Sequence, residues 1–130
     1  MKILVCGGRN YGMNDDGTHN DDEIDLVFDV MEEIDPDEIV EGGARGADTF
    51  ARTWGHANYK EVHTMRADWT KYGLGAGPRR NQQMLDEHKD ISLVVAFPGG
   101  NGTADMVRRA KKAGIPVKEI VNTSMGEFFG

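Results

Sequence analysis

Three glycine-rich segments are the part of this sequence whose residue types could bind a ligand. Each follows a short apolar run where a strand is predicted, and the three are Cys6–Arg9, Gly42–Asp48 and Pro98–Thr103. Glycine lets a backbone approach a ligand closely, and the free N–H groups at the start of a following helix bind anions. One such turn would more often serve only the fold. Three turns converging on one sheet edge instead predict a phosphate-binding crevice.

Arginines beside these turns strengthen the prediction of an anion site. A guanidinium is planar, permanently charged and able to hold a phosphate through two hydrogen bonds. Three other arginines are instead expected to be solvated surface residues: Arg52, Arg108 and Arg109. The residues predicted to bind the ligand or its phosphate are Gly7, Gly8, Arg9, Gly42, Gly43, Ala44, Arg45, Gly46, Arg80, Asn81, Pro98, Gly99, Gly100, Asn101, Gly102 and Thr103.

Two common classes of nucleotide enzyme lack their sequence motifs here. None of the three turns reads G-x-G-x-x-G, and none continues into G-K-[ST], so neither a dehydrogenase nor a P-loop hydrolase is predicted. The four histidines and the single cysteine show no metal-ligand spacing. We therefore predict no metal site and no required cofactor, and we expect Cys6 to be a small buried residue at a strand end.

Alternation of short aliphatic runs with segments of helical period predicts parallel strands joined by helices. The expected strands are Lys2–Cys6, Glu38–Glu41, Glu61–Thr64, Ile91–Phe97 and Pro116–Ile120. The expected helices contain the apolar stripes of residues 24–34 and 47–57, or span Pro78–His88 and Thr103–Ala113. Right-handed crossovers then give a small Rossmann-like, three-layer α/β domain with a mainly parallel five-stranded sheet in the order 3-2-1-4-5.

The length of 130 residues fits one domain, which we place at residues 1–120, with a polar, acidic loop insert at about 13–22 and a tail at 121–130. The net charge is −7, but thirteen of the 22 acidic residues lie in 14–41, a stretch without lysine or arginine. The remainder is mildly basic, which allows a small anionic ligand, whereas the overall charge makes nucleic acid an unfavourable partner. A single cysteine and the absence of long apolar runs lead us to expect a cytoplasmic protein without membrane association.

Four segments together resemble a known protein family. They are Gly42–Asp48, Ala67–Trp69, Gly77–Met84 and Phe97–Met106, and they resemble the YspA/YpsA-related family of the SLOG superfamily. That resemblance implies a Rossmann-like fold that binds nucleotides or NAD-derived ligands. It also implies kinship with the LOG phosphoribohydrolases, which cleave the N-glycosidic bond of nucleoside 5′-monophosphates, and with the DNA-processing protein DprA.

The LOG-type motifs are only partly present, which leaves the activity open. Arg80, four residues before Met84, matches the arginine that those enzymes use. Their glutamate corresponds to Met106, and Asp105 precedes it by one residue. Methionine cannot stabilise an oxocarbenium charge or activate water, so Arg80 and Asp105 are the candidate catalytic pair for such a reaction. One helical position is a rotation of about 100°, and we therefore expect Asp105 to point elsewhere.

Three further residues, Asp68, Trp69 and Asp48, could have either a functional or a structural role. Asp68 and Trp69 could contact a sugar and a base, or could fix a loop to the domain. Asp48 is expected to cap or balance the dipole of the helix that follows the second glycine turn.

Three hypotheses follow. The first is a binding protein for a nucleotide or an NAD- or ADP-ribose-derived ligand. The second is a LOG-like phosphoribohydrolase, and the third is a module that binds a basic partner through the acidic segment 14–41. DprA-like binding of single-stranded DNA is a remote fourth, and a homodimer is expected.

Overall fold

A computed structural model of the chain describes residues 1–122 and consists of one parallel sheet between two layers of helices. The strands are β1 (Lys2–Cys6), β2 (Glu38–Glu41), β3 (Glu61–Thr64), β4 (Ile91–Ala96) and β5 (Val117–Glu119). They are ordered β3-β2-β1-β4-β5, and every neighbouring pair is parallel. The predicted fold class and strand order are therefore confirmed.

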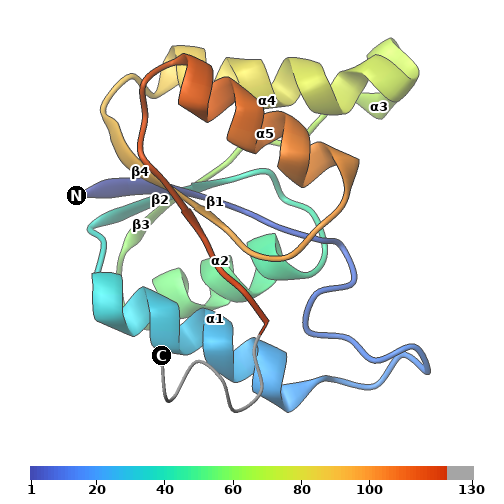
Figure 1. The fold of residues 1–130 in the computed structure, drawn as a ribbon, viewed down its shortest axis with the longest axis vertical. Helices are drawn as coiled ribbons and strands as arrows, with labels where there is room; N and C mark the ends of the chain where they lie inside the picture. Colours follow the sequence, from blue (N-terminus) through green and yellow to red (C-terminus); the bar gives the residue numbers. More distant parts are fainter. Residues whose placement is uncertain (123–130) are drawn as a thin grey trace.

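The helices divide between the two faces of the sheet, as Figure 1 shows. They are α1 (Asp21–Ile34), α2 (Ala47–Ala57), α3 (Trp69–Tyr72), α4 (Ala76–Glu87) and α5 (Asn101–Lys112), with a 3-10 turn at Gly73–Gly75. Helices α1 and α2 cover one face, and α4 and α5 cover the other. The strands point the same way, so the loops that follow them gather along one edge, at the right of the figure.

Each layer buries the apolar stripe that its sequence period predicts. On one face Val27 and Met31 of α1 and Trp54 of α2 pack against Ile3 and other residues of the sheet. On the opposite face Met84 of α4 and Met106 of α5 pack against Leu4. The sheet centre is apolar on both sides, as expected for a doubly covered parallel sheet.

The segment between β3 and α4 differs from the expected open connection. It forms α3 and the 3-10 turn, and α4 begins at Ala76 instead of Pro78. Proline fits there because the first-turn N–H groups of a helix have no acceptor within it. The Asp68 side chain accepts a hydrogen bond from the Lys71 N–H and so caps α3. Sequence reasoning missed this four-residue helix because it buries no residue and leaves no apolar stripe.

None of the helices in residues 1–122 is both long enough and apolar enough to cross a bilayer. Of the predicted tail at residues 121–130, the positions 123–130 lie outside the described residues. Asn122 still contacts the domain, because its side-chain oxygen accepts a hydrogen bond from the Tyr11 hydroxyl at 2.7 Å.

Gly46 is required for the close approach of α2 to the first glycine turn. Its φ is +80°, and a β-carbon built there would overlap the carbonyl oxygen of Gly8. By contrast, a β-carbon at Gly102 in the first turn of α5 would meet no atom within 4 Å.

We expect Gly46→Ala to lower the free energy of unfolding by at least about 2 kcal/mol, because strained backbone and steric overlap add. Gly102→Ala is the control and should leave stability unchanged or raise it by up to about 1 kcal/mol. Urea unfolding of both variants measures the difference. Equal stabilities would show that the Gly46 turn accommodates a side chain.

Candidate functional site

A cavity of about 800 Å³ lies at the carboxyl ends of the strands, between the glycine turns and helices α4 and α5. Its volume suits a nucleotide-sized ligand. The predicted site residues that line it are Gly7, Gly8, Arg9, Gly42, Ala44, Trp69, Arg80, Asn81, Gly100, Asn101, Gly102, Thr103 and Asp105. A second cavity of about 490 Å³ adjoins it and includes Gly43 and Arg45 in its wall.

Four predicted residues line neither cavity: Gly46, Asp68, Pro98 and Gly99. Three of them shape the turns instead. The Gly46 backbone packs against Gly8, the Pro98 carbonyl accepts a hydrogen bond from the Gly8 N–H at 2.9 Å, and Gly99 lies against Thr103. The fourth, Asp68, is the cap of α3.

The third glycine turn leaves donors facing the cavity. Helix α5 begins at Asn101, and the N–H groups of its first turn have no acceptor within the helix. Among the described residues, the first backbone hydrogen bond at this end of α5 joins the Ala104 N–H to the Gly100 carbonyl at 3.0 Å. The positive end of the α5 dipole therefore faces the cavity, where it can bind an anion.

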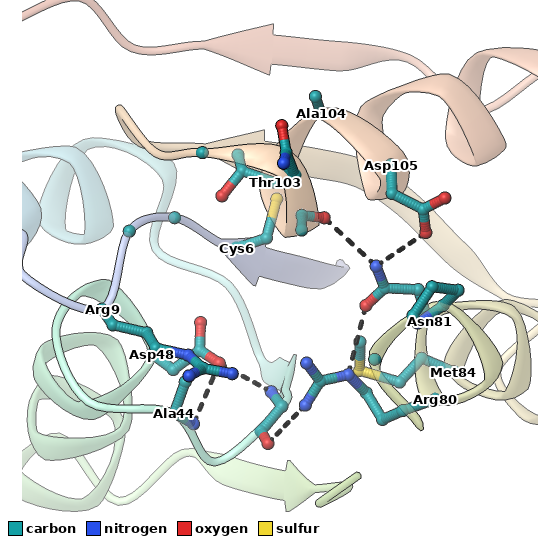
Figure 2. Close-up of a pocket in the computed structure, with 18 of the residues that line it drawn as sticks. Cys6, Arg9, Ala44, Asp48, Arg80, Asn81, Met84, Thr103, Ala104 and Asp105 are labelled. Atoms are coloured by element: carbon teal, nitrogen blue, oxygen red, sulfur yellow. Dashed lines mark hydrogen bonds between the residues drawn. The ribbon is translucent and has the colours of Figure 1, made fainter. Parts of the chain in front are cut away.

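The second glycine turn differs, because carboxylates of the protein already accept its N–H groups. Asp48 accepts from Gly42 at 3.1 Å and from Ala44 at 3.2 Å, and Glu41 accepts from Gly43 at 2.7 Å. These three N–H groups are therefore not free to hold phosphate, as Figure 2 shows for the Asp48 contacts. Asp48 binds the preceding turn and does not cap its own helix, which corrects the expectation of a cap, but it does lie in the first turn of α2, where an acid balances the helix dipole.

Both carboxylates are buried, and burial changes the chemistry of Asp48. Loss of water, with repulsion by Glu41, raises the pKa of Asp48 to about 7, although the N–H groups of Ala44 and Gly42 and the charge of Arg80 oppose the rise. Glu41 is completely buried, bound by the Thr64 hydroxyl and placed 3.6 Å from Arg52. Asp48 can therefore exchange a proton near neutral pH.

Arg80 and Asn81, in the first half of α4, connect two of the three turns (Figure 2). Arg80 donates to the Gly42 carbonyl at 2.6 Å and to the Asn81 side-chain oxygen at 3.1 Å. The Asn81 amide nitrogen donates to the Gly102 carbonyl at 3.2 Å and to Asp105 at 3.0 Å. The bridge therefore fixes the second turn and the start of α5 relative to each other.

Asp105 faces the cavity, contrary to the expectation that it would point elsewhere, but it is fully engaged by neighbours. Arg108 and Arg109 donate to its oxygens at 2.6 and 2.8 Å. Burial acts to raise the pKa of Asp105, but the hydrogen bonds from Arg109 and Asn81 outweigh it, so the pKa lies below its usual value. Met106 is completely buried in the core beneath α5.

The three arginines expected in solvent are therefore all ion-paired. Arg108 and Arg109 bind Asp105, and Arg52 reaches the buried Glu41. Sequence spacing gave no reason to expect this, except that Asp105 lies three and four positions before the two arginines on one helix face.

Trp69 lies at the boundary of the two cavities and is about half exposed. The Arg9 guanidinium carbon lies 5.2 Å from the centre of its ring. Arg79 pairs in the same manner with Tyr72, at 4.4 Å, outside both cavities. Trp69 therefore positions a cavity arginine through a cation–π contact. The sequence predicted for Trp69 only a contact with a base or a role in fixing the loop.

The amino ends of the strands, opposite the cavity, carry a second cluster of titratable groups. A His63 nitrogen lies 2.9 Å from Glu38 and 3.7 Å from Glu61, and the His63 ring centre lies 4.9 Å from that of His88. Within the described part of the chain, Glu38, Glu61 and His63 lie close enough together to hold a metal ion. Lys2, 3.6 Å from Glu38, already brings a positive charge to the cluster.

Comparison with known proteins places the chain in a family. A model of the YspA, cpYpsA-related SLOG family matches residues 1–72, which is more than half of the chain. The chain belongs to this family. It is also similar to the Gene 61 protein of Mycobacterium phage D29, with 43% identity over 86 residues, which cover 61% of this chain and 67% of that protein.

The SLOG family match covers only one part of the cavity. It extends from β1 to α3 and so includes the first two glycine turns, Arg9 and Trp69. The bridge residues Arg80 and Asn81 and the open turn at the start of α5 lie beyond it. The family match therefore does not extend to the part of the cavity formed by α4 and α5.

We expect Asp48→Asn to gain stability relative to the natural protein as the pH rises. Because the folded-state pKa of Asp48 is raised to about 7 from 3.8, ionising it costs free energy in the folded protein only. That cost is absent below about pH 4, grows up to about pH 7 and is complete above it. Asparagine retains an oxygen for the Gly42 and Ala44 N–H groups but does not ionise.

Urea unfolding of both proteins between about pH 4 and pH 8 measures the difference in their free energies of unfolding. The difference should shift steadily in favour of the variant. A difference independent of pH would show that Asp48 is ionised throughout this range.

Proposed function

We propose that this protein binds a nucleotide, or an NAD- or ADP-ribose-derived ligand, with a phosphate at the start of α5. The observation that carries the proposal is the open first turn of α5, which faces a cavity of nucleotide size beside Arg9 and Arg80. Membership of a SLOG family supports the same ligand class. Backbone N–H groups and the Thr103 hydroxyl are the donors for the phosphate, and the two guanidiniums supply charge.

The two arginines have different parts in the proposed site. Arg80 is partly buried and donates hydrogen bonds to the backbone carbonyls of Gly42 and Met65 and to the Asn81 side chain, so its replacement would disturb the turn as well as the ligand. Arg9 is exposed and its contact is with the ring of Trp69. Arg9 is therefore the residue at which ligand binding can be separated from folding.

The proposal is binding without cleavage of the N-glycosidic bond. Met106 replaces the carboxylate that such cleavage uses and is buried in the core. Asp105 is the carboxylate nearest in sequence, but two guanidiniums and an amide hold it ionised. An ionised carboxylate whose charge is balanced by guanidiniums in this way is a weak base and a weak stabiliser of developing positive charge.

We expect Arg9→Gln to weaken binding of AMP or ADP-ribose about tenfold, the effect of losing one charge-assisted hydrogen bond to phosphate. The melting temperature of the free protein should stay nearly unchanged. Arg79→Gln is the matched control, because it removes the same charge from a position outside both cavities.

Ligand-observed NMR with AMP, ADP-ribose and NAD measures binding and turnover together. Line broadening that Arg9→Gln reduces and Arg79→Gln does not would support the proposal. Absence of broadening with all three ligands would reject it. New signals of free base and ribose phosphate would show a hydrolase and overturn the claim of binding without cleavage.

A further inference from the structure

The smaller cavity has the charge of an anion site. Within residues 1–122, four arginines and no carboxylate line it: they are Arg9, Arg45, Arg66 and Arg80. The larger cavity differs, because Asp48 and Asp105 face it together with arginines. A chain with 22 acidic and 15 basic residues has thus concentrated positive charge alone in one hollow.

Three of these arginines have no carboxylate partner among residues 1–122. Arg45 donates to the side-chain oxygen of Asn10 at 3.1 Å, and Arg66 donates to the Gly43 carbonyl at 2.8 Å. Arg9 stacks on Trp69. Neutral partners hold these guanidiniums in place without cancelling their charge.

Two buried carboxylates of the second glycine turn act on Arg80, because burial lowers the pKa of its guanidinium and the charges of Asp48 and Glu41 oppose that shift. Glu41 is completely buried, bound by the Thr64 hydroxyl and the Gly43 N–H, and lies beside Arg52. Asp48 faces the other cavity and accepts two backbone N–H groups. Both acids shape the turn from inside, while the arginines cover its outer side.

The two cavities share part of their walls, namely Arg9, Gly42, Ala44, Trp69 and Arg80. A ligand with its first phosphate at the start of α5 can therefore extend past Arg9 and Arg80 into the smaller cavity. We propose that the ligand carries two phosphoryl groups and that the second one binds in the cavity of Arg45 and Arg66. This inference rests on the proposed function, because it assumes a nucleotide in the larger cavity.

The second phosphoryl group can be joined to the first, as in ADP, or lie on the other side of the sugar, as in adenosine 3′,5′-bisphosphate. Isothermal titration calorimetry with AMP, ADP and the bisphosphate at one ionic strength distinguishes these two positions of the second phosphoryl group. The quantity measured is the affinity of each doubly phosphorylated ligand divided by that of AMP. This ratio cancels any effect of a substitution on the cavity at α5.

We expect the ratio to be about tenfold or more for one of the two ligands in the natural protein, because a charge-assisted hydrogen bond contributes that much. Arg45→Gln and Arg66→Gln should each bring it towards one while leaving AMP affinity within about twofold. Arg79→Gln, outside both cavities, should leave it unchanged.

The other outcomes separate the two proposals. If AMP binds but neither doubly phosphorylated ligand binds more tightly, the second site is rejected and the proposed function stands. A ratio that Arg79→Gln lowers as much as Arg45→Gln does would reflect the general field of the surface and would also reject the site. If no ligand binds, the proposed function itself fails. Thermal melting of each variant confirms that it is folded.

Discussion

The geometry of the cavity depends on the hydrogen-bonded bridge that Arg80 and Asn81 of α4 form. Parallel strands bring their carboxyl ends to one edge, but the loops that follow are more mobile than the strands and could move away from one another. Arg80 prevents this on one side by holding the Gly42 carbonyl, and Asn81 does so on the other by holding Gly102 and Asp105. Asn81 is buried, so losing any of its partners would leave a polar group unsatisfied, which makes the arrangement stiff.

The same bridge explains why the carboxylates of the site are not free. Asp105 accepts hydrogen bonds from Asn81 and from two arginines. Glu41 and Asp48 accept hydrogen bonds from backbone N–H groups of the second glycine turn. Each acid therefore satisfies donors of the protein and fixes a loop. Arg9, which also lines the cavity, has no such acidic partner among the described residues. The carboxylates at this edge of the sheet therefore have a structural role, whereas the charge of Arg9 is not cancelled by an acidic partner within residues 1–122.

Strands, strand order and helix faces could be predicted because they follow from periodicity, which is local in the sequence. The convergence of three turns also followed, since parallel topology places all of them at one edge. The functional difference between the turns did not follow. Whether an N–H is free depends on contacts such as Gly43 with Glu41 and on which side chain reaches Ala44, and these are set by three-dimensional packing. The pairing of Arg52 with Glu41 escaped prediction for the same reason, as did that of His63 with Glu38.

The difference between the second and third turns has a physical origin in what precedes each helix. Gly46 packs against the Gly8 carbonyl, and the Ala47 N–H is directed at that oxygen, so the start of α2 is closed by the first turn. Gly100 and Gly102 meet nothing where a side chain would be, so the start of α5 has open space around it. Both helices carry a positive end, but water or a ligand can reach only the second freely. Of the two helices that follow glycine turns, α2 and α5, only α5 thus has an open terminus within residues 1–122.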